Sequence, residues 1–228
     1  MPVLSQHLGQ SAKRSAWVGM RQVFSEANHW RAFALSCLMM AGSFSIIPYI
    51  TIYTTTNVGL RADQVPLIYL AGGVATLFTA RLWGWMSDRW GKVATFRLVS
   101  ALAVVPMMAL TLLPPVPLWM VLVVTTAFFV FVSGRMVPGM ALLTAAPQAS
   151  MRGAFMSANG ALQSVTMGVS AWLGGSLISR SPQGLVQGYE RCGWLAAVTT
   201  LVLLWWVGQV RVHGGGASAQ ANQNQARA

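Results

Sequence analysis

Long apolar runs separated by short polar segments constrain the fold of this chain more than any other feature of its sequence. An α-helix rises ~1.5 Å per residue, so a run of about 18 residues or more can cross the ~30 Å hydrocarbon core of a membrane. Only 8% of the residues are charged, whereas a soluble protein has roughly 25%. The sequence therefore predicts an all-α integral membrane protein.

The apolar runs predict three regions along the chain. A basic leader covers residues 1–31 and includes a short interfacial helix over 16–26. A bundle covers 32–210, with six spans expected at 32–54, 65–86, 93–113, 118–142, 151–178 and 192–210. A tail at 211–228 has no apolar residue larger than alanine after Val212, so we expect it to be disordered. The segment "PPVP" at 114–117 is expected to split the bundle into its first three and last three helices.

The formal net charge of +11 raises the question of a nucleic-acid ligand. With the N-terminus in the cytoplasm, twelve of the fifteen Lys and Arg residues lie on the cytoplasmic side of the expected spans. The three exceptions are Arg61, Arg180 and Arg191. Membrane proteins retain positive loops in the cytoplasm, so topology explains the charge. We expect both termini in the cytoplasm and no nucleic-acid partner.

The ionisable residues give little sign of catalysis. The three histidines lie outside the expected spans, and no two have the spacing of metal ligands on one element. An intramembrane serine protease needs a histidine in a span, so we expect no enzyme, no metal and no cofactor. The four acids lie in loops or at span edges, and they are Glu26, Asp63, Asp88 and Glu190.

The segment "GWMSDRWGK" lies at the cytoplasmic end of the second expected span. Gly84 would let a neighbouring helix come close, and Gly91 permits a turn with positive φ. Asp88 is expected to cap the next helix or to pair with arginines of neighbouring helices. Arg89 and Lys92 keep the loop in the cytoplasm. Two interpretations remain open: a capped hairpin that only fixes topology, and a charged latch that breaks and forms as helices move.

The fifth expected span carries two faces at helical spacing. Small residues form one face, and they are Ser157, Ala161, Ser164, Gly168, Ala171 and Gly175. Such a stripe favours close helix packing. Polar residues form the other face, and they are Asn159, Gln163, Thr166 and Ser170. Because polar groups facing lipid are costly, this face should form interhelical hydrogen bonds or line a wet cavity.

Two further positions stand out inside the spans. Pro48 lies in the middle of the first span beside Tyr49 and near Tyr53, and a proline there should bend the helix. Arg135 lies in the fourth span, and we expect its long side chain to reach the cytoplasmic headgroups. If it stays inside the bundle instead, it becomes a candidate for the substrate cavity.

The residues Gly84, Asp88, Arg89, Gly91 and Lys92 match a loop motif, G-x-x-x-D-R-x-G-[RK], and the chain therefore resembles the major facilitator superfamily. In that family the motif lies between helices two and three and again between helices eight and nine. This sequence departs from it at Met86 and Val93. Residues 147–178 resemble helix eleven of bacterial drug and sugar efflux antiporters, and the basic leader resembles the linker between the two halves.

The resemblance implies the C-terminal half of such a transporter, helices seven to twelve in a 3+3 inverted repeat. It implies proton-coupled efflux of a small solute by alternating access in the bacterial inner membrane. The candidate cavity residues are Tyr49, Tyr53, Asn159, Gln163 and Arg135. The implied partners are lipid, the solute, and either a separate N-terminal half or a second copy. No acid lies within a span, so a non-transporting fragment or scaffold of the same ancestry is the alternative.

Overall fold

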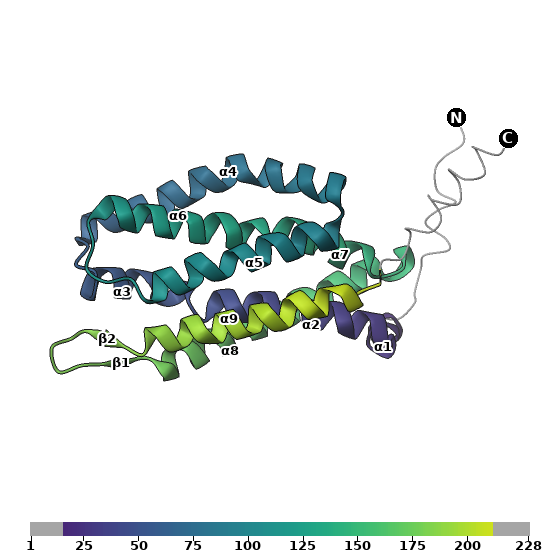
Figure 1. Cartoon of the computed structure of the whole chain (residues 1–228). Helices are drawn as coiled ribbons and strands as arrows, with labels where there is room; N and C mark the ends of the chain where they lie inside the picture. Colours follow the sequence, from purple (N-terminus) through teal and green to yellow (C-terminus); the bar gives the residue numbers. More distant parts are fainter. Residues whose placement is uncertain (1–15, 212–228) are drawn as a thin grey trace, which may run out of the picture.

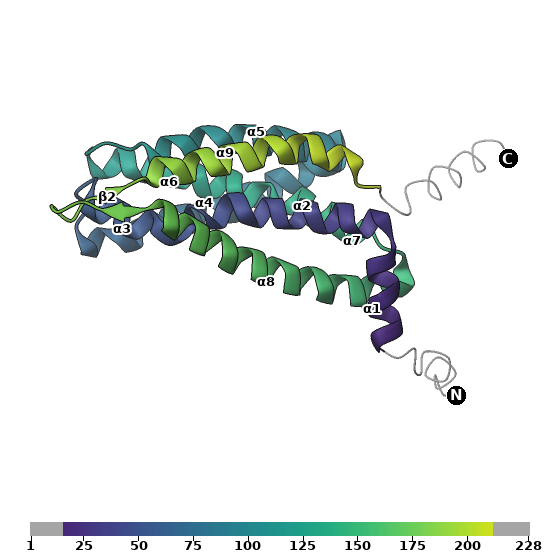
Figure 2. The ribbon, with the colours of Figure 1, turned by 90° about the horizontal axis from the view of Figure 1, so that it is seen from below.

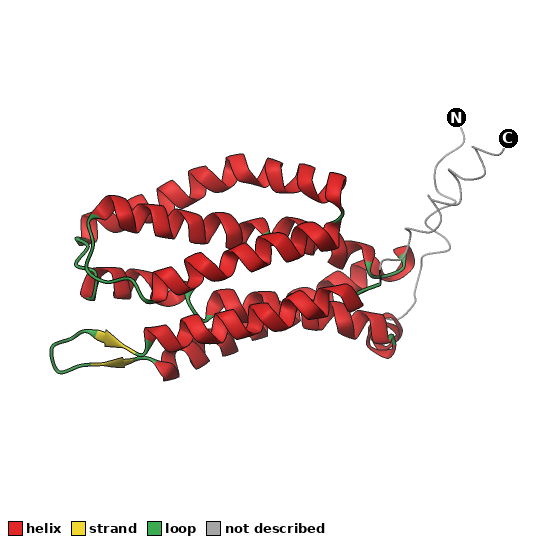
Figure 3. Ribbon diagram, in the orientation of Figure 1, coloured by secondary structure: helices red, strands yellow, loops and turns green. Residues whose placement is uncertain are grey.

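A computed structural model of the chain describes residues 16–211. The predicted tail after 211 and the first part of the leader lie outside the described residues. Helices make up nearly all of the described chain, with one short hairpin (Figures 1 and 3). The helices are α1 (Ala16–Ser25), α2 (Ala27–Phe44), α3 (Ile50–Thr56), α4 (Val65–Trp90), α5 (Lys92–Thr111), α6 (Leu118–Gly134), α7 (Met136–Ala145), α8 (Arg152–Leu177) and α9 (Tyr189–Trp206). The antiparallel strands are β1 (Ser179–Arg180) and β2 (Val186–Gln187).

Five helical segments of the described chain are long and apolar enough to cross a membrane. They are Ala27–Thr56, Ala62–Trp90, Lys92–Thr111, Leu118–Ala145 and Tyr189–Gln209, and they overlap five of the six predicted spans. The remaining span, predicted at 151–178, corresponds to α8. This helix has 26 residues but is not among the five, because its polar face lowers its hydropathy.

The first and fourth expected spans are each broken near a proline. A 3-10 turn at Ile47–Tyr49 separates α2 from α3, which agrees with the bend predicted at Pro48. Arg135 separates α6 from α7, three residues before Pro138. Proline has no backbone N–H and clashes with the preceding turn of a helix. Ser45 lies three residues before Pro48, as Arg135 does before Pro138. Both side chains are fully buried.

The helices pack in two sets that do not follow chain order. In one set α6 lies against α4 and α5, and in the other α2 lies against α8 and α9 (Figures 1 and 2). The two sets meet where α5 packs on α9. The expected split at 114–117 is therefore wrong. The first helix of each predicted group, α2 in one and α6 in the other, packs with the last two helices of the opposite group. This exchange interlocks the two halves of the bundle.

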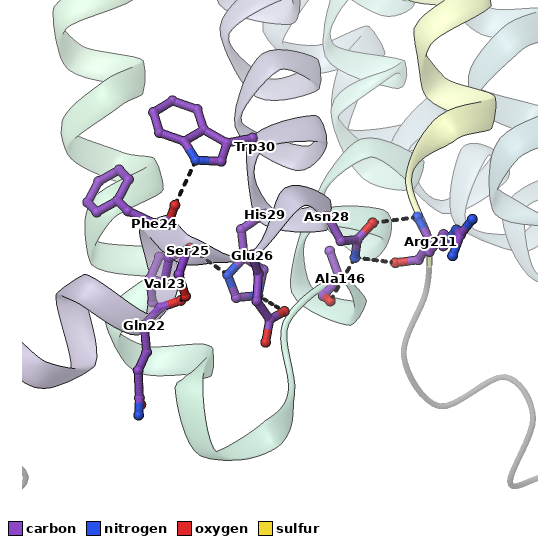
Figure 4. A network of polar contacts seen from close by, with 10 residues as sticks. All are labelled: Gln22, Val23, Phe24, Ser25, Glu26, Asn28, His29, Trp30, Ala146 and Arg211. Atoms are coloured by element: carbon purple, nitrogen blue, oxygen red, sulfur yellow. Dashed lines mark hydrogen bonds and ion pairs between the residues drawn. The ribbon is translucent and has the colours of Figure 1, made fainter.

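Hydrogen bonds fasten both ends of the bundle. At one end the Asn57 side chain donates to the Val186 carbonyl and accepts from its N–H, which ties α3 to β2. At the other end the Asn28 side chain donates to the carbonyls of Ala146 and Arg211 and accepts from the Arg211 N–H (Figure 4). The start of α2 and the last described residue are therefore at the same end.

The helix predicted over 16–26 is confirmed as α1, and His29 connects it to the bundle (Figure 4). Its interfacial position stays a prediction. The His29 Nδ1 atom lies 2.8 Å from the Val23 carbonyl oxygen, and Nε2 lies 3.4 Å from a Glu26 carboxylate oxygen. The ring also packs 5.0 Å from that of Phe155 on α8. The prediction that His29 lies outside the spans is wrong, because His29 is in the first turn of α2 and is fully buried.

Candidate functional site

The charged hairpin is tighter than expected, because α4 continues to Trp90 and α5 begins at Lys92. Asp88 and Arg89 are therefore exposed residues of the last helical turn and not loop residues. The expected cap is wrong, since no side chain caps α5. Among residues 16–211 the ion pairs are His29–Glu26 and Arg61–Asp63, so Asp88 has none. Arg89 lies over the Trp85 ring instead, 5.3 Å from its centroid.

The two glycines of this motif have different roles. Gly91 has φ +89° and ψ 148°, a conformation that only glycine adopts readily, so the turn predicted there is confirmed. A Cβ atom on Gly84 would meet no atom within 4 Å. The close helix approach expected at Gly84 is therefore absent from this conformation.

Arg135 does not reach the headgroups, and that expectation is wrong. Its side chain is fully buried between α2, α6 and α9. Nη2 donates to the Met39 carbonyl at 3.0 Å and to Ser43 Oγ at 2.7 Å, and Nη1 donates to Thr200 Oγ1 at 3.3 Å. Nε has no partner. The break between α6 and α7 turns this residue inward, and the guanidinium fastens α2 to α9.

The other predicted cavity residues do not converge on one site. The Tyr49 hydroxyl donates to the Ala171 carbonyl, and the Tyr53 hydroxyl donates to the Leu113 carbonyl. Gln163 Nε2 donates to Ser36 Oγ at 2.7 Å, in the middle of α2. Asn159 is buried, and its Oδ1 atom has no partner. The three hydrogen-bonded side chains therefore connect different parts of the bundle.

The two faces of α8 behave differently. Asn159 and Ser170 are buried and Gln163 is half-buried, so the polar face lies inside the bundle as predicted. Most of the small-residue stripe is exposed, and a Cβ on Gly168 would meet no atom within 4 Å. Only the end of the stripe packs closely, where a Cβ on Gly175 would lie 2.6 Å from the Tyr49 hydroxyl oxygen. The packing predicted at Gly168 is therefore absent from the described chain.

Sequence reasoning missed a pocket between α4 and α6. It has a volume of about 280 Å³. Its lining consists of Thr76, Leu77, Thr79, Ala80 and Trp83 from α4 and of Ser133 and Gly134 from α6. These residues lie near the middle of α4 and at the α6–α7 break, far from both ends of their helical segments. The two parts are about fifty residues apart in the chain, so periodicity within one helix could not bring them together.

The chemistry of this pocket suits a hydrogen-bonding solute. The Trp83 side chain is 7% exposed, and its Nε1–H donor has no partner within the described part of the chain. Ser133 is exposed. The hydroxyls of Thr76 and Thr79 donate to carbonyls of their own helix, which leaves their oxygen lone pairs as acceptors. Gly134 makes room for the indole, since a Cβ there would lie 2.5 Å from Trp83 Nε1.

Comparison with known proteins gives one family. The family model described as Major Facilitator Superfamily matches residues 4–226. No curated protein matches the chain.

Proposed function

Because the chain belongs to the Major Facilitator Superfamily, whose members carry solutes across membranes and are not typically enzymes, we propose that the pocket between α4 and α6 takes part in that transport. The supporting observation is the unpartnered Trp83 Nε1–H donor in a small pocket near the middle of the helices. An unmade hydrogen bond at a buried donor costs about 1–3 kcal/mol. Nε1 is covered by Gly134 in this conformation, so a solute with a hydrogen-bond acceptor would satisfy the donor when the indole moves away from Gly134. Solute sites near the middle of the bilayer are typical of alternating access.

We further propose that the chain supplies the C-terminal half of a proton-coupled efflux transporter of a bacterial inner membrane. The Gly84–Lys92 motif and the likeness of residues 147–178 to helix eleven support this assignment. None of the four acids lies in the middle of an expected span, so a carboxylate that couples transport to protons would come from a separate N-terminal half or another chain. The partners are then lipid, a small solute and that second half.

The two ends of the bundle support a sixth crossing by α8. Asn28 and Arg211 are hydrogen-bonded to each other at one end. A chain that starts and finishes on one side of a membrane crosses it an even number of times, and five crossings would separate these residues. The positive-inside bias supports a cytoplasmic position for that side, with the β1–β2 hairpin on the outside.

Solute transport by the full chain in proteoliposomes tests the proposed function. The chain is reconstituted alone and with any separately encoded six-helix partner, a pH gradient is imposed, and a panel of labelled sugars and amphipathic drugs is offered. We expect uptake or release of at least one solute, and loss of that activity in Ser133→Trp, which fills the pocket. The matched control is Val123→Trp, at an exposed position of the same helix.

Each result bears on the proposal. Activity in the control and none in Ser133→Trp supports the pocket. Equal activity in both variants would remove the pocket from the transport path. No activity in any preparation, with correctly folded protein, would favour a non-transporting scaffold.

A further inference from the structure

Arg97 is a cation on the outer surface of the bundle, inside a membrane-spanning segment. It lies five residues after the start of α5 at Lys92, which is about 7.5 Å along the helix at ~1.5 Å per residue. On α9 it lies beside Leu204, which precedes the end of its own span at Gln209 by five residues. Charged groups facing hydrocarbon are costly, so this position calls for a stabilising partner.

Contacts with α9 hold the Arg97 side chain in place. Nε donates to the Leu204 carbonyl at 3.0 Å. Gly208 makes room for the guanidinium, because a Cβ there would lie 2.6 Å from Nη2. Within the described residues the Nη1 and Nη2 donors form no hydrogen bond, and none of the ion pairs there includes Arg97. The Arg97 guanidinium is therefore held in one orientation, while its two Nη groups have no hydrogen-bond partner within the described residues.

An apolar groove continues from Arg97 along the line where α5 meets α9. Its volume is about 560 Å³, and its lining is Arg97, Leu98, Ala101, Leu201, Leu204 and Trp205. Leu201 is 59% exposed and Trp205 is 64% exposed. The groove is shallow and combines a cation with an apolar surface and with a tryptophan, a residue typical of the membrane interface.

We propose that this groove is a binding site for one anionic phospholipid, such as phosphatidylglycerol. The phosphate accepts hydrogen bonds from the Nη donors of Arg97, and one acyl chain lies along Leu98, Leu201 and Trp205. Arginine binds phosphate through its planar fork of donors. The preference is for an anionic lipid because no carboxylate pairs with Arg97 within the described residues. The acid on α9, Glu190, lies in the first turn of that helix, at the end opposite Leu204. In a zwitterionic lipid the headgroup ammonium cancels the charge of the phosphate.

Native mass spectrometry of the detergent-purified full chain tests this proposal. Phosphatidylglycerol and phosphatidylcholine are titrated separately, and the affinity for the first bound lipid is measured. We expect phosphatidylglycerol to bind more tightly than phosphatidylcholine. Arg97→Gln should weaken phosphatidylglycerol binding about fivefold, the effect of one basic residue near a membrane surface, and should abolish the preference. Arg152→Gln is the matched control, since it removes the same charge from an exposed position on α8.

A second variant separates charge from geometry. Gly208→Val keeps the net charge but crowds the guanidinium, so it should lose the preference as Arg97→Gln does. Equal weakening by Arg152→Gln would overturn the proposal, because it would show a general effect of charge. Equal binding of the two lipids by the unaltered chain would overturn it too. All variants are compared only after size-exclusion chromatography shows a monodisperse protein.

Discussion

Arg135 is a buried cation held by neutral groups on two helices. The described chain gives it no carboxylate, and its partners are Met39, Ser43 and Thr200. Removing a charge from water costs several kcal/mol unless excellent geometry compensates. Sequence reasoning could identify this residue but not its environment. Its partners lie 65 to 96 positions away in the chain, and the break that turns it inward depends on tertiary packing.

Replacing Arg135 should separate the effect of its charge from that of its geometry. Arg135→Lys keeps the charge but loses the fork that reaches α2 and α9 together. Each hydrogen bond to a charged group contributes about 1.5–3 kcal/mol, so we expect a lower thermal midpoint. Arg135→Met removes the buried charge and fills similar space, so its midpoint should equal or exceed that of the unaltered chain. Thermal unfolding in detergent measures both, and a more stable Lys variant would contradict this account.

Gly91 and Gly84 form a matched pair for testing the tight hairpin. Gly91→Ala places a side chain at φ +89°, which should cost about 1–3 kcal/mol. Gly84→Ala lies inside α4 with open space around it, so it should be neutral or stabilising by roughly 0.5–1 kcal/mol. Thermal unfolding of the two variants gives the comparison. If Gly84→Ala is the more harmful, a close contact at Gly84 forms that this conformation lacks.

Asp88 is exposed and has no ion-pair partner among residues 16–211, so a latch function requires a partner that it meets only in another conformation. Asp88→Asn keeps the size of the side chain and removes its charge. We expect unchanged membrane insertion and stability but transport slowed about tenfold, the effect of ~1.4 kcal/mol. Initial transport rates normalised to the amount of folded protein measure this. Unchanged transport rates would show that the motif only fixes the topology of the hairpin. Asp63→Asn is the control, because Asp63 lies just before the start of α4 and Asp88 lies in its last turn.

At the scale of the elements, hydropathy and proline predicted most of the helices. The five apolar segments and the break at Pro48 followed from local sequence. The exchange of first helices between the two sets did not, because it depends on which apolar surfaces fit each other. The pocket between α4 and α6 was missed for the same reason. In the sequence, Trp83 resembles an ordinary core residue. Its N–H without a partner in the described chain is recognised only from the packing of the indole against Gly134 on another helix.

The element α1 should detach when His29 is removed. His29 bonds the Val23 carbonyl of α1, and it also contacts Glu26 between α1 and α2 and the ring of Phe155 on α8. His29→Ala loses these contacts while α2 retains its apolar face, so we expect faster trypsin cleavage after Arg21, which is exposed, and little change in the thermal midpoint. Asn28→Ala is the control, because Asn28 bonds Ala146 and Arg211 but not α1. Equal cleavage in both variants would show that His29 does not hold α1.

At the scale of the whole molecule, the number of crossings depends on α8. Composition alone leaves α8 out of the five apolar segments, yet it packs along α2 and α9. Its polar face lies inside the bundle, and Gln163 of this face bonds Ser36 of α2. A polar helix is tolerated in a bilayer when a neighbouring helix satisfies its polar side chains. A hydropathy average treats each residue separately, so it does not detect a hydrogen bond between side chains of two helices.

Cysteine labelling in intact cells decides whether α8 crosses. Cys37 and Cys192 are first replaced by alanine, and single cysteines are introduced as Ser150→Cys before α8 and Gln183→Cys in the hairpin, both at exposed positions. If α8 crosses, a membrane-impermeant maleimide should label Gln183→Cys in intact cells and Ser150→Cys only after permeabilisation. Labelling of both from one side would place α8 along the surface. Without α8, five crossings would remain, and they would leave Asn28 and Arg211 on opposite sides of the membrane. The hydrogen bond between these two residues would then be impossible, so the arrangement of the bundle would be wrong.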